Sequence, residues 1–204
     1  MKKSILFAIL CCAALLFAAC NKNDEPKEES NNNQNEGTAT GTKNGHDWVN
    51  LGLSVKWATC NIGADKPEEY GDYYAWGETA TKSTYSWDTY KHGTYNFDGN
   101  NSKLTKYNTT DEKTSLEAAD DAATVNWGEG WRMPTDAELD ELIKKCTWTW
   151  TTKNGVKGCE IKATNGNTIF LPAAGYRNSS SLDLVGIYGG YWSSSLNADG
   201  ASYA

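Results

Sequence analysis

Gly189-Gly190-Tyr191-Trp192-Ser193-Ser194-Ser195, close to the end of the sequence, excludes a helix in this region and sets the fold class of the domain before it. Two glycines and three serines in seven residues favour turns and extended chain. The tyrosine and tryptophan make the stretch too aromatic for a linker. One interpretation is a core strand with Trp192 buried and the serines at an edge. The other is a strand that ends at a binding surface built from the loops beside it.

The composition of the 204 residues predicts one β-rich domain with appendages. Nine Trp and eleven Tyr stand against four Phe and two Met, and wide aromatic rings pack well on pleated sheets. Nineteen glycines indicate many turns. The formal net charge is −7 and there is no basic patch to neutralise phosphates, which argues against nucleic acid as a partner.

The first twenty residues read as an export signal. Lys2 and Lys3 precede an apolar run over residues 5–19, which is short for a membrane span. The end of the run, Leu16-Phe17-Ala18-Ala19-Cys20, resembles the bacterial lipobox. The resemblance implies that residues 1–19 are removed and that Cys20 receives a diacylglycerol, which anchors the protein to a membrane. The alternative is an ordinary secretory signal with a coincidental cysteine.

Residues 20–45 are predicted to be a lipid-anchored, disordered tether. Residues 21–45 contain almost no apolar side chain, so they cannot bury enough surface to fold. The acidic, lysine-containing stretch after Cys20 resembles the surface-export signal of Bacteroidetes lipoproteins. The resemblance implies an outer-membrane location with the domain facing the cell exterior, and a periplasmic location remains the alternative.

Several strands are predicted from period-two patterns and Asn-Gly turns. Residues 46–61 read as two short strands, in which alternate residues are apolar. A two-residue turn at Asn154-Gly155 places Cys159 opposite Trp150 and Ile161 opposite Trp148, so that these four side chains share one face. A second turn at residues 165–166 leads into residues 168–172, which are apolar on both faces and are expected to form a central, covered strand.

Two helices are predicted from capping patterns. Ser115 can cap a helix over residues 116–126, whose carboxylates Glu117, Asp120 and Asp121 are expected on a solvated face. Thr135-Asp136-Ala137-Glu138 is a capping box, and its helix is expected to run to about Lys145. The apolar face of that second helix is predicted to consist of Leu139, Leu142, Ile143 and Cys146.

Five separate motifs in order resemble one family, the "Fibrobacter succinogenes major paralogous domain" of Bacteroidetes lipoproteins. The motifs are Trp-Ala-Thr-Cys-Asn-Ile-Gly-Ala at 57–64, Tyr-Gly-Asp-Tyr-Tyr-Ala-Trp-Gly-Glu at 70–78, Trp-Arg-Met-Pro-Thr at 131–135, Phe-Leu-Pro-Ala-Ala-Gly at 170–175 and Gly-Tyr-Trp-Ser-Ser-Ser at 190–195. The resemblance covers nearly all of residues 46–204. It implies an α+β, C-type-lectin-like fold, in which two helices flank short twisted antiparallel sheets. Family members usually continue beyond the last motif to a further strand, so the domain at 46–204 is expected to be incomplete.

The ligand face of such a domain is expected in the loops around Tyr188, Asn197, Asp199 and Ser202. Tyrosine, serine and asparagine offer contact area and adaptable hydrogen bonds at low entropic cost. The alternative is that these four are ordinary solvated loop residues.

After removal of residues 1–19 and acylation of Cys20, three thiols remain in an oxidising compartment: Cys60, Cys146 and Cys159. The hairpin register places Cys146 opposite Ala163, which disfavours a bridge between Cys146 and Cys159. We therefore expect a disulfide between Cys60 and Cys146, with Cys159 free. Three free thiols are the alternative.

Catalytic and metal chemistry find little support in the sequence. His46 and His92 are the only histidines, and no Cys-x-x-Cys or Gly-x-Ser-x-Gly pattern occurs. A formylglycine-generating activity needs a reactive cysteine pair late in the domain, and no cysteine follows Cys159. Residues 98–101 lack the ligand pattern of an EF-hand, so calcium is not expected there. The predicted function is that of a non-catalytic module without metal or cofactor that binds a glycan, peptide or partner protein. The alternative is a structural or fimbria-associated envelope component.

Overall fold

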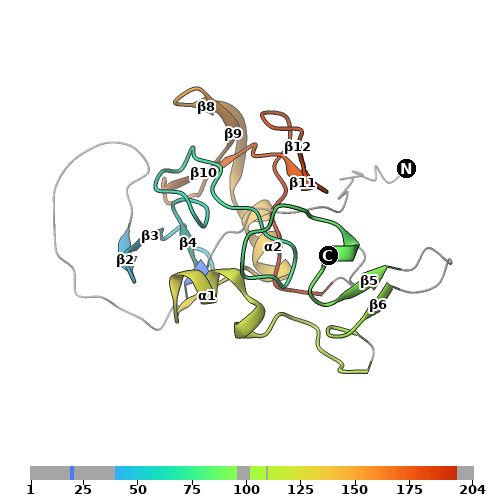
Figure 1. Cartoon of the computed structure of the whole chain (residues 1–204). Coiled ribbons are helices and arrows are strands. Elements are labelled where there is room, and N and C mark those ends of the chain that lie inside the picture. The colour runs from blue at the N-terminus through green and yellow to red at the C-terminus, as the bar shows by residue number, and fades with distance from the viewer. Residues whose placement is uncertain (1–18, 21–39, 96–101, 109, 197–204) are drawn as a thin grey trace, which may run out of the picture.

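The computed structural model describes residues 19–20, 40–95, 102–108 and 110–196 (Figure 1). Within them the chain forms short antiparallel sheets with two helices, so the α+β class predicted from the sequence is confirmed. Most of the predicted signal sequence, residues 1–18, and most of the predicted tether, residues 21–39, lie outside the described residues. None of the described helices is long and apolar enough to cross a membrane.

The largest sheet gathers strands from distant parts of the chain in the order β2-β3-β4-β1-β7. Its members are β2 (Gly41–Lys43), β3 (His46–Val49), β4 (Lys56–Ala58), β1 (Ala19–Cys20) and β7 (Trp131–Arg132). The pairs are antiparallel throughout. Because β1 pairs with β4 on one side and β7 on the other, β4 and β7 run parallel, one strand apart.

The predicted end of the tether, at residue 45, is wrong. Residues 41–49 form a hairpin, in which Asn44 and Gly45 make a tight turn with φ angles of 51° and 82° that pairs β2 with β3. Gly41 lacks a side chain, and the space a Cβ would take is filled by the indole ring of Trp48. A polar segment can therefore fold here because its partner strand supplies the apolar surface.

The alternating pattern after β3 buries one side of the chain, as predicted. Val49, Leu51, Leu53, Val55 and Trp57 are all buried in the main core, although residues 50–55 connect β3 to β4 as irregular chain.

The first predicted helix is wrong at its start. A 3₁₀ turn, η2 (Ala118–Asp120), precedes a short helix α1 (Ala122–Trp127). The cap is Asp121, whose Oδ1 accepts from the Thr124 N–H at 2.9 Å, and not Ser115. Asp120 and Asp121 are buried, so the solvated-face interpretation fails for both and holds only for the exposed Glu117.

The second predicted helix is confirmed as α2 (Asp136–Lys145), and Thr135 and Glu138 form the reciprocal capping box. Leu142 is fully buried, and Leu139 and Cys146 pack against the core. Ile143 is 56 % exposed, which corrects its assignment to the apolar face.

The predicted hairpins form a three-stranded sheet with the predicted register (Figure 1). Its strands are β8 (Thr147–Lys153), β9 (Val156–Lys162) and β10 (Thr168–Pro172), and Trp148 pairs with Ile161 and Trp150 with Cys159. β10 is almost fully buried, as predicted. However, β9 and not β10 is the central strand.

The remaining elements are small. β5 (Gly93–Tyr95) pairs with β6 (Ser102–Leu104), η1 (Trp87–Thr89) is a single 3₁₀ turn, and β11 (Tyr176–Asn178) pairs with β12 (Ser181–Asp183).

The glycine- and serine-rich stretch 189–195 forms hydrogen bonds with segments from several distant parts of the chain, but it is not a regular strand. Tyr191 and Trp192 pack against the main core, and the Trp192 Nε1 donates to the Tyr74 carbonyl at 3.1 Å. Ser194 is buried, its N–H donates to the Pro134 carbonyl, and its own carbonyl accepts from Leu116. The core-strand interpretation of this stretch therefore holds only in part: Tyr191 and Trp192 contact the core, but no regular strand forms, Trp192 is only half-buried, and Ser194 is buried and not at an edge.

Candidate functional site

The first candidate surface is the tryptophan strand, which is β8 with its exposed Trp148 and Trp150. β8 pairs only with β9 among the described residues, so its other edge is free. The two indoles lie on the same face as Ile161, which is fully buried, yet they are 39 % and 53 % exposed. Every residue of β8 is exposed or only partly buried, whereas β9 and β10 both contain buried residues. The sequence predicted the face that these tryptophans share, but not their exposure.

The second candidate surface is the aliphatic turn, which consists of Leu182 in β12 and the apolar residues directly after that strand. In the part of the chain that the structure describes, six of the eight exposed large hydrophobic residues belong either to the tryptophan strand or to this turn. The turn contributes Leu182, Leu184, Val185 and Ile187, of which Ile187 is 70 % exposed. Soluble surfaces scatter such side chains singly, whereas clusters mark interaction sites.

The conformation of the aliphatic turn is held by backbone hydrogen bonds. The N–H groups of Ile187 and Tyr188 both donate to the Leu184 carbonyl, at 3.1 and 3.0 Å. Leu184 has a φ of 57°, which costs energy for a residue with a side chain. Ala173 connects the turn to the hairpin sheet, because its carbonyl accepts from Gly186 and its N–H donates to Lys157 of β9.

Tyr188, a ligand-binding residue predicted from the sequence, lies directly after the aliphatic turn. It is half-buried, and its ring meets that of Tyr176 edge to face with centroids 6.3 Å apart. Burial, with the neighbouring Tyr176 adding to it, raises the pKa of Tyr188, so the phenol stays neutral and can donate a hydrogen bond. The other predicted members, Asn197, Asp199 and Ser202, lie outside the described residues.

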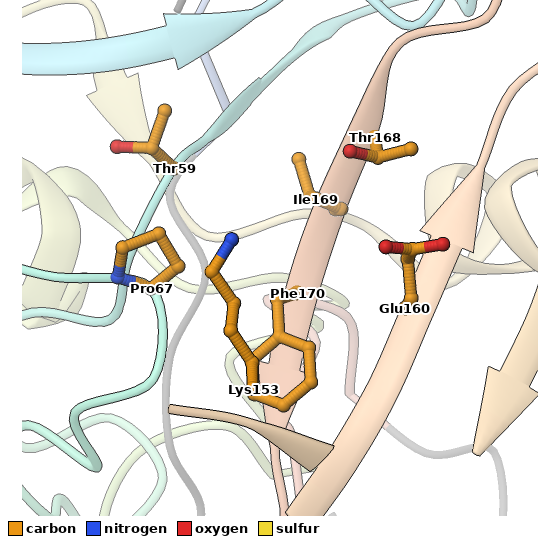
Figure 2. A pocket seen from close by; sticks show the side chains of 7 residues that line it. All are labelled: Thr59, Pro67, Lys153, Glu160, Thr168, Ile169 and Phe170. Atoms are coloured by element: carbon orange, nitrogen blue, oxygen red, sulfur yellow. The ribbon is translucent and has the colours of Figure 1, made fainter. Parts of the chain in front are cut away.

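A pocket lies between the loop after β4 and the face of the β8-β9-β10 sheet opposite the two tryptophans (Figure 2). Lys153 and Glu160 contribute one positive and one negative charge to its lining. The lining residues are Thr59, Pro67, Lys153, Glu160, Thr168, Ile169 and Phe170. Lys153 belongs to β8, but the side chains of Trp148 and Trp150 point to the opposite face of the sheet, so the pocket does not include the two indoles.

A buried ionic cluster around Asp120 was not predicted. Its carboxylate accepts from Lys91 Nζ at 2.7 Å, from the Tyr107 hydroxyl at 2.8 Å and from Lys106 Nζ. Burial alone would raise the pKa of Asp120, but the hydrogen bonds from Lys106 and Lys91 outweigh it and hold the pKa well below its ordinary value. The carboxylate is thus fully occupied by protein donors and fixes the 3₁₀ turn to the segment around β5 and β6.

Cys60, Cys146 and Cys159 are free thiols, so the predicted bridge between Cys60 and Cys146 is not formed in the structure. The reason is local, since the Cys60 sulfur lies against the carbonyl of Ala64, 3.2 Å away within its own turn. Burial raises the pKa of all three thiols, which keeps them protonated and unreactive at neutral pH.

Within the described ranges, no three His, Cys, Asp or Glu side chains gather as metal ligands, and residues 98–101 fall outside those ranges. Comparison of the chain with family models, curated proteins and solved structures finds no match.

Proposed function

We propose that this chain is a lipid-anchored, surface-displayed binding protein whose C-type-lectin-like domain takes a glycan ligand without chemical turnover. The anchor is Cys20, supported by the lipobox-like Leu-Phe-Ala-Ala-Cys sequence and the polar residues that follow. The five sequence motifs and the α+β architecture support membership of the major paralogous domain family.

The observation that carries the proposal is the exposure of Trp148 and Trp150 on one face of an edge strand. Alternate residues of a strand stand about 7 Å apart, so the two indoles form a row along β8. Large aromatic side chains left in water forgo the stabilisation that their burial provides. The apolar face of a sugar ring can cover an indole, while the ring hydroxyls bond to water and to neighbouring polar groups.

The aliphatic turn supports a second candidate function, the binding of a fixed protein partner in the cell envelope. Leu182, Leu184, Val185 and Ile187 offer no hydrogen-bonding side chain, and such a surface suits the apolar centre of a protein interface.

The lipid anchor is tested by Cys20→Ser in the full chain, expressed in a bacterium with a lipoprotein export pathway. We expect the wild-type protein to partition with outer membranes and to gain the mass of acyl chains on Cys20. The variant should leave the outer-membrane fraction and retain residues 1–19, because acylation precedes cleavage. An unacylated wild-type protein cut elsewhere would overturn the anchor.

The glycan proposal is tested on an array of bacterial, plant and animal polysaccharides. We expect the wild-type protein to bind at least one sugar class, and Trp148→Ala with Trp150→Ala to weaken that binding at least tenfold. The matched control, Val125→Ala with Ile143→Ala, removes equally exposed apolar side chains elsewhere and should bind normally. If the folded wild-type protein binds no sugar, the glycan proposal fails, and binding of a partner protein becomes the better-supported function.

A further inference from the structure

The tetrapeptide Thr-Lys-Asn-Gly occurs twice in the chain, at 42–45 and at 152–155. Each copy contains the two-residue turn of a β-hairpin, between β2 and β3 and between β8 and β9. The asparagine φ is 51° at Asn44 and 47° at Asn154, and the glycine that follows has a φ of 82° and 85° respectively. The two copies share one turn conformation, so they differ mainly in the contacts that the rest of the domain makes with them.

An asparagine that precedes a glycine can lose its side-chain amide without an enzyme. The glycine nitrogen attacks Cγ of the asparagine, its proton passes to the amide nitrogen, and ammonia leaves as a five-membered succinimide closes. Water then opens either C–N bond of the ring, which produces aspartate or isoaspartate. Glycine permits the attack because it has no Cβ to obstruct it. Ring closure needs rotation of the asparagine backbone and side chain, so contacts that fix the turn slow the reaction.

The turn at Asn44 is fixed by a distant part of the chain. The Asn44 amide donates to the carbonyls of Trp127 and Glu129, at 2.9 and 3.1 Å. The carbonyl of Lys43, the preceding residue, accepts from Trp131 Nε1 at 3.0 Å. Ring closure at Asn44 must therefore break two hydrogen bonds of the reacting amide in a turn that is also held from behind.

A third Asn-Gly pair, which follows β9, is held in a different way. The Asn165 amide donates to the Asn50 carbonyl at 2.8 Å, and its side-chain oxygen accepts from the Asn167 N–H at 3.0 Å. The nitrogen that would attack, that of Gly166, donates to the Ala163 carbonyl at 3.0 Å. Both reacting groups of this pair are restrained.

Asn154 and Gly155 are the least restrained of the three pairs, and both residues are exposed. In the described part of the chain the Gly155 N–H has no acceptor, and the Asn154 side chain makes a single hydrogen bond, from Nδ2 to a Glu68 carboxylate oxygen at 2.9 Å. The turn ends β8, which has no buried residue, so it can open without uncovering the core.

The hydrogen bond between Asn154 and Glu68 joins the tip of the hairpin to the loop after β4. Their neighbours Lys153 and Pro67 both line the pocket (Figure 2). The hydrogen bond from Asn154 lowers the pKa of Glu68, so this carboxylate is charged at neutral pH. Either product of deamidation places a second carboxylate opposite Glu68, and two like charges at this distance repel.

We propose that Asn154 is a site of spontaneous deamidation, and that its conversion releases the loop after β4 from the hairpin sheet. The same tetrapeptide at 42–45 keeps its amide because the folded domain holds it. The modified fraction rises with the age of the folded protein, and one wall of the pocket changes with it.

The rate of deamidation is tested in the full chain, purified in detergent and incubated at pH 8, with peptide mapping by mass spectrometry. The mapping uses a protease that leaves each Asn-Gly pair inside a longer peptide. We expect Asn154 of the folded protein to convert at least about tenfold faster than Asn44 or Asn165, which corresponds to about 1.4 kcal/mol of barrier. In urea the tertiary contacts are absent, and the two copies of Thr-Lys-Asn-Gly should convert at similar rates.

Two results would overturn the deamidation site. One is an equal rate at Asn44 and Asn154 in the folded protein. The other is an Asn154 that stays intact in the folded protein while the same residue reacts in the unfolded chain.

The release of the loop is tested with Asn154→Asp, which installs one product without incubation. We expect hydrogen exchange to become several times faster at Asp65 and Lys66, whose N–H groups donate to Glu69 inside the loop. Asn154→Asp combined with Glu68→Gln exchanges donor and acceptor, and should restore the wild-type exchange. If Asn154→Asp leaves the exchange of the loop unchanged, or if Glu68→Gln does not restore it, the proposed release is wrong even where Asn154 deamidates.

Discussion

Asp120→Asn is expected to lower the free energy of unfolding by about 3 kcal/mol, the cost of removing one partner from a buried ionic cluster. The Asp120 side chain is 5 % exposed and bonds to Lys91, Lys106 and Tyr107. Lys91 is half exposed and can turn to water, which places the loss at the lower end of the range for buried pairs. Urea unfolding at pH 7 measures it.

The matched control for this substitution is Asp140→Asn, which breaks an exposed ion pair with Lys144 on α2. Both side chains of that pair are mostly in water, so a change of at most about 0.5 kcal/mol is expected. Equal effects of the two substitutions would contradict a special role for the buried cluster.

The same cluster predicts a pH dependence. Because the folded-state pKa of Asp120 lies below the unfolded value of about 4, its stabilisation is present above pH 4 and is lost as the pH falls through the folded pKa. The difference in unfolding free energy between the wild type and Asp120→Asn should be constant from pH 5 to 8 and shrink below pH 4. A constant difference down to pH 2 would show that the carboxylate charge is not responsible.

Gly175→Ala is expected to destabilise the domain by about 3 kcal/mol and to displace the aliphatic turn. Gly175 has a φ of 72°, which costs a residue with a side chain about 1–2 kcal/mol. Its added methyl group would also overlap the Asp183 carbonyl and lie 2.9 Å from the Val185 nitrogen, and overpacking of this kind costs about 1–3 kcal/mol. Thermal unfolding measures the loss, and proteolysis after Leu184 measures the displacement.

Gly155→Ala is the control that separates backbone strain from steric overlap. Gly155 has a φ of 85° in the turn between β8 and β9, but an added methyl group there meets nothing within 4 Å. We expect a loss of only about 1 kcal/mol, from backbone strain alone. If Gly155→Ala lowers the free energy of unfolding as much as Gly175→Ala does, the overlap with the Asp183 backbone does not contribute to the loss of stability.

Local patterns predicted those elements whose structure depends on neighbours in sequence. The Asn154-Gly155 turn and the alternating Thr and Trp residues of β8 fix a hairpin register without help from the rest of the domain. The capping box at Thr135 and Glu138 is equally self-contained. The helix predicted to start at Ser115 failed because Asp120 and Asp121 are held by Lys91 and Met133, distant partners that the local sequence does not reveal.

The candidate surfaces could be predicted only in part. Alternation along β8 shows that Trp148 and Trp150 share a face, but exposure depends on how far the neighbouring elements extend over that face. The clustering of Leu184, Val185 and Ile187 is visible in the sequence, yet such a run is equally compatible with a buried strand. Tyr188 was identified by its position beside the aromatic stretch, and the structure places it beside the exposed turn.

The two sheets differ in how far apart along the chain their strands lie, and this difference predicts an order of folding. β8, β9 and β10 are consecutive within residues 147–172, whereas β4 and β7 are separated by more than seventy residues. Pairing between neighbours closes short loops and is fast, whereas pairing between distant strands must first overcome the entropy of a long loop. We expect the hairpin sheet to form early and the sheet containing β4 and β7 to close last. The sheet that contains β4 and β7 would then be the last part of the domain to become protected from proteases.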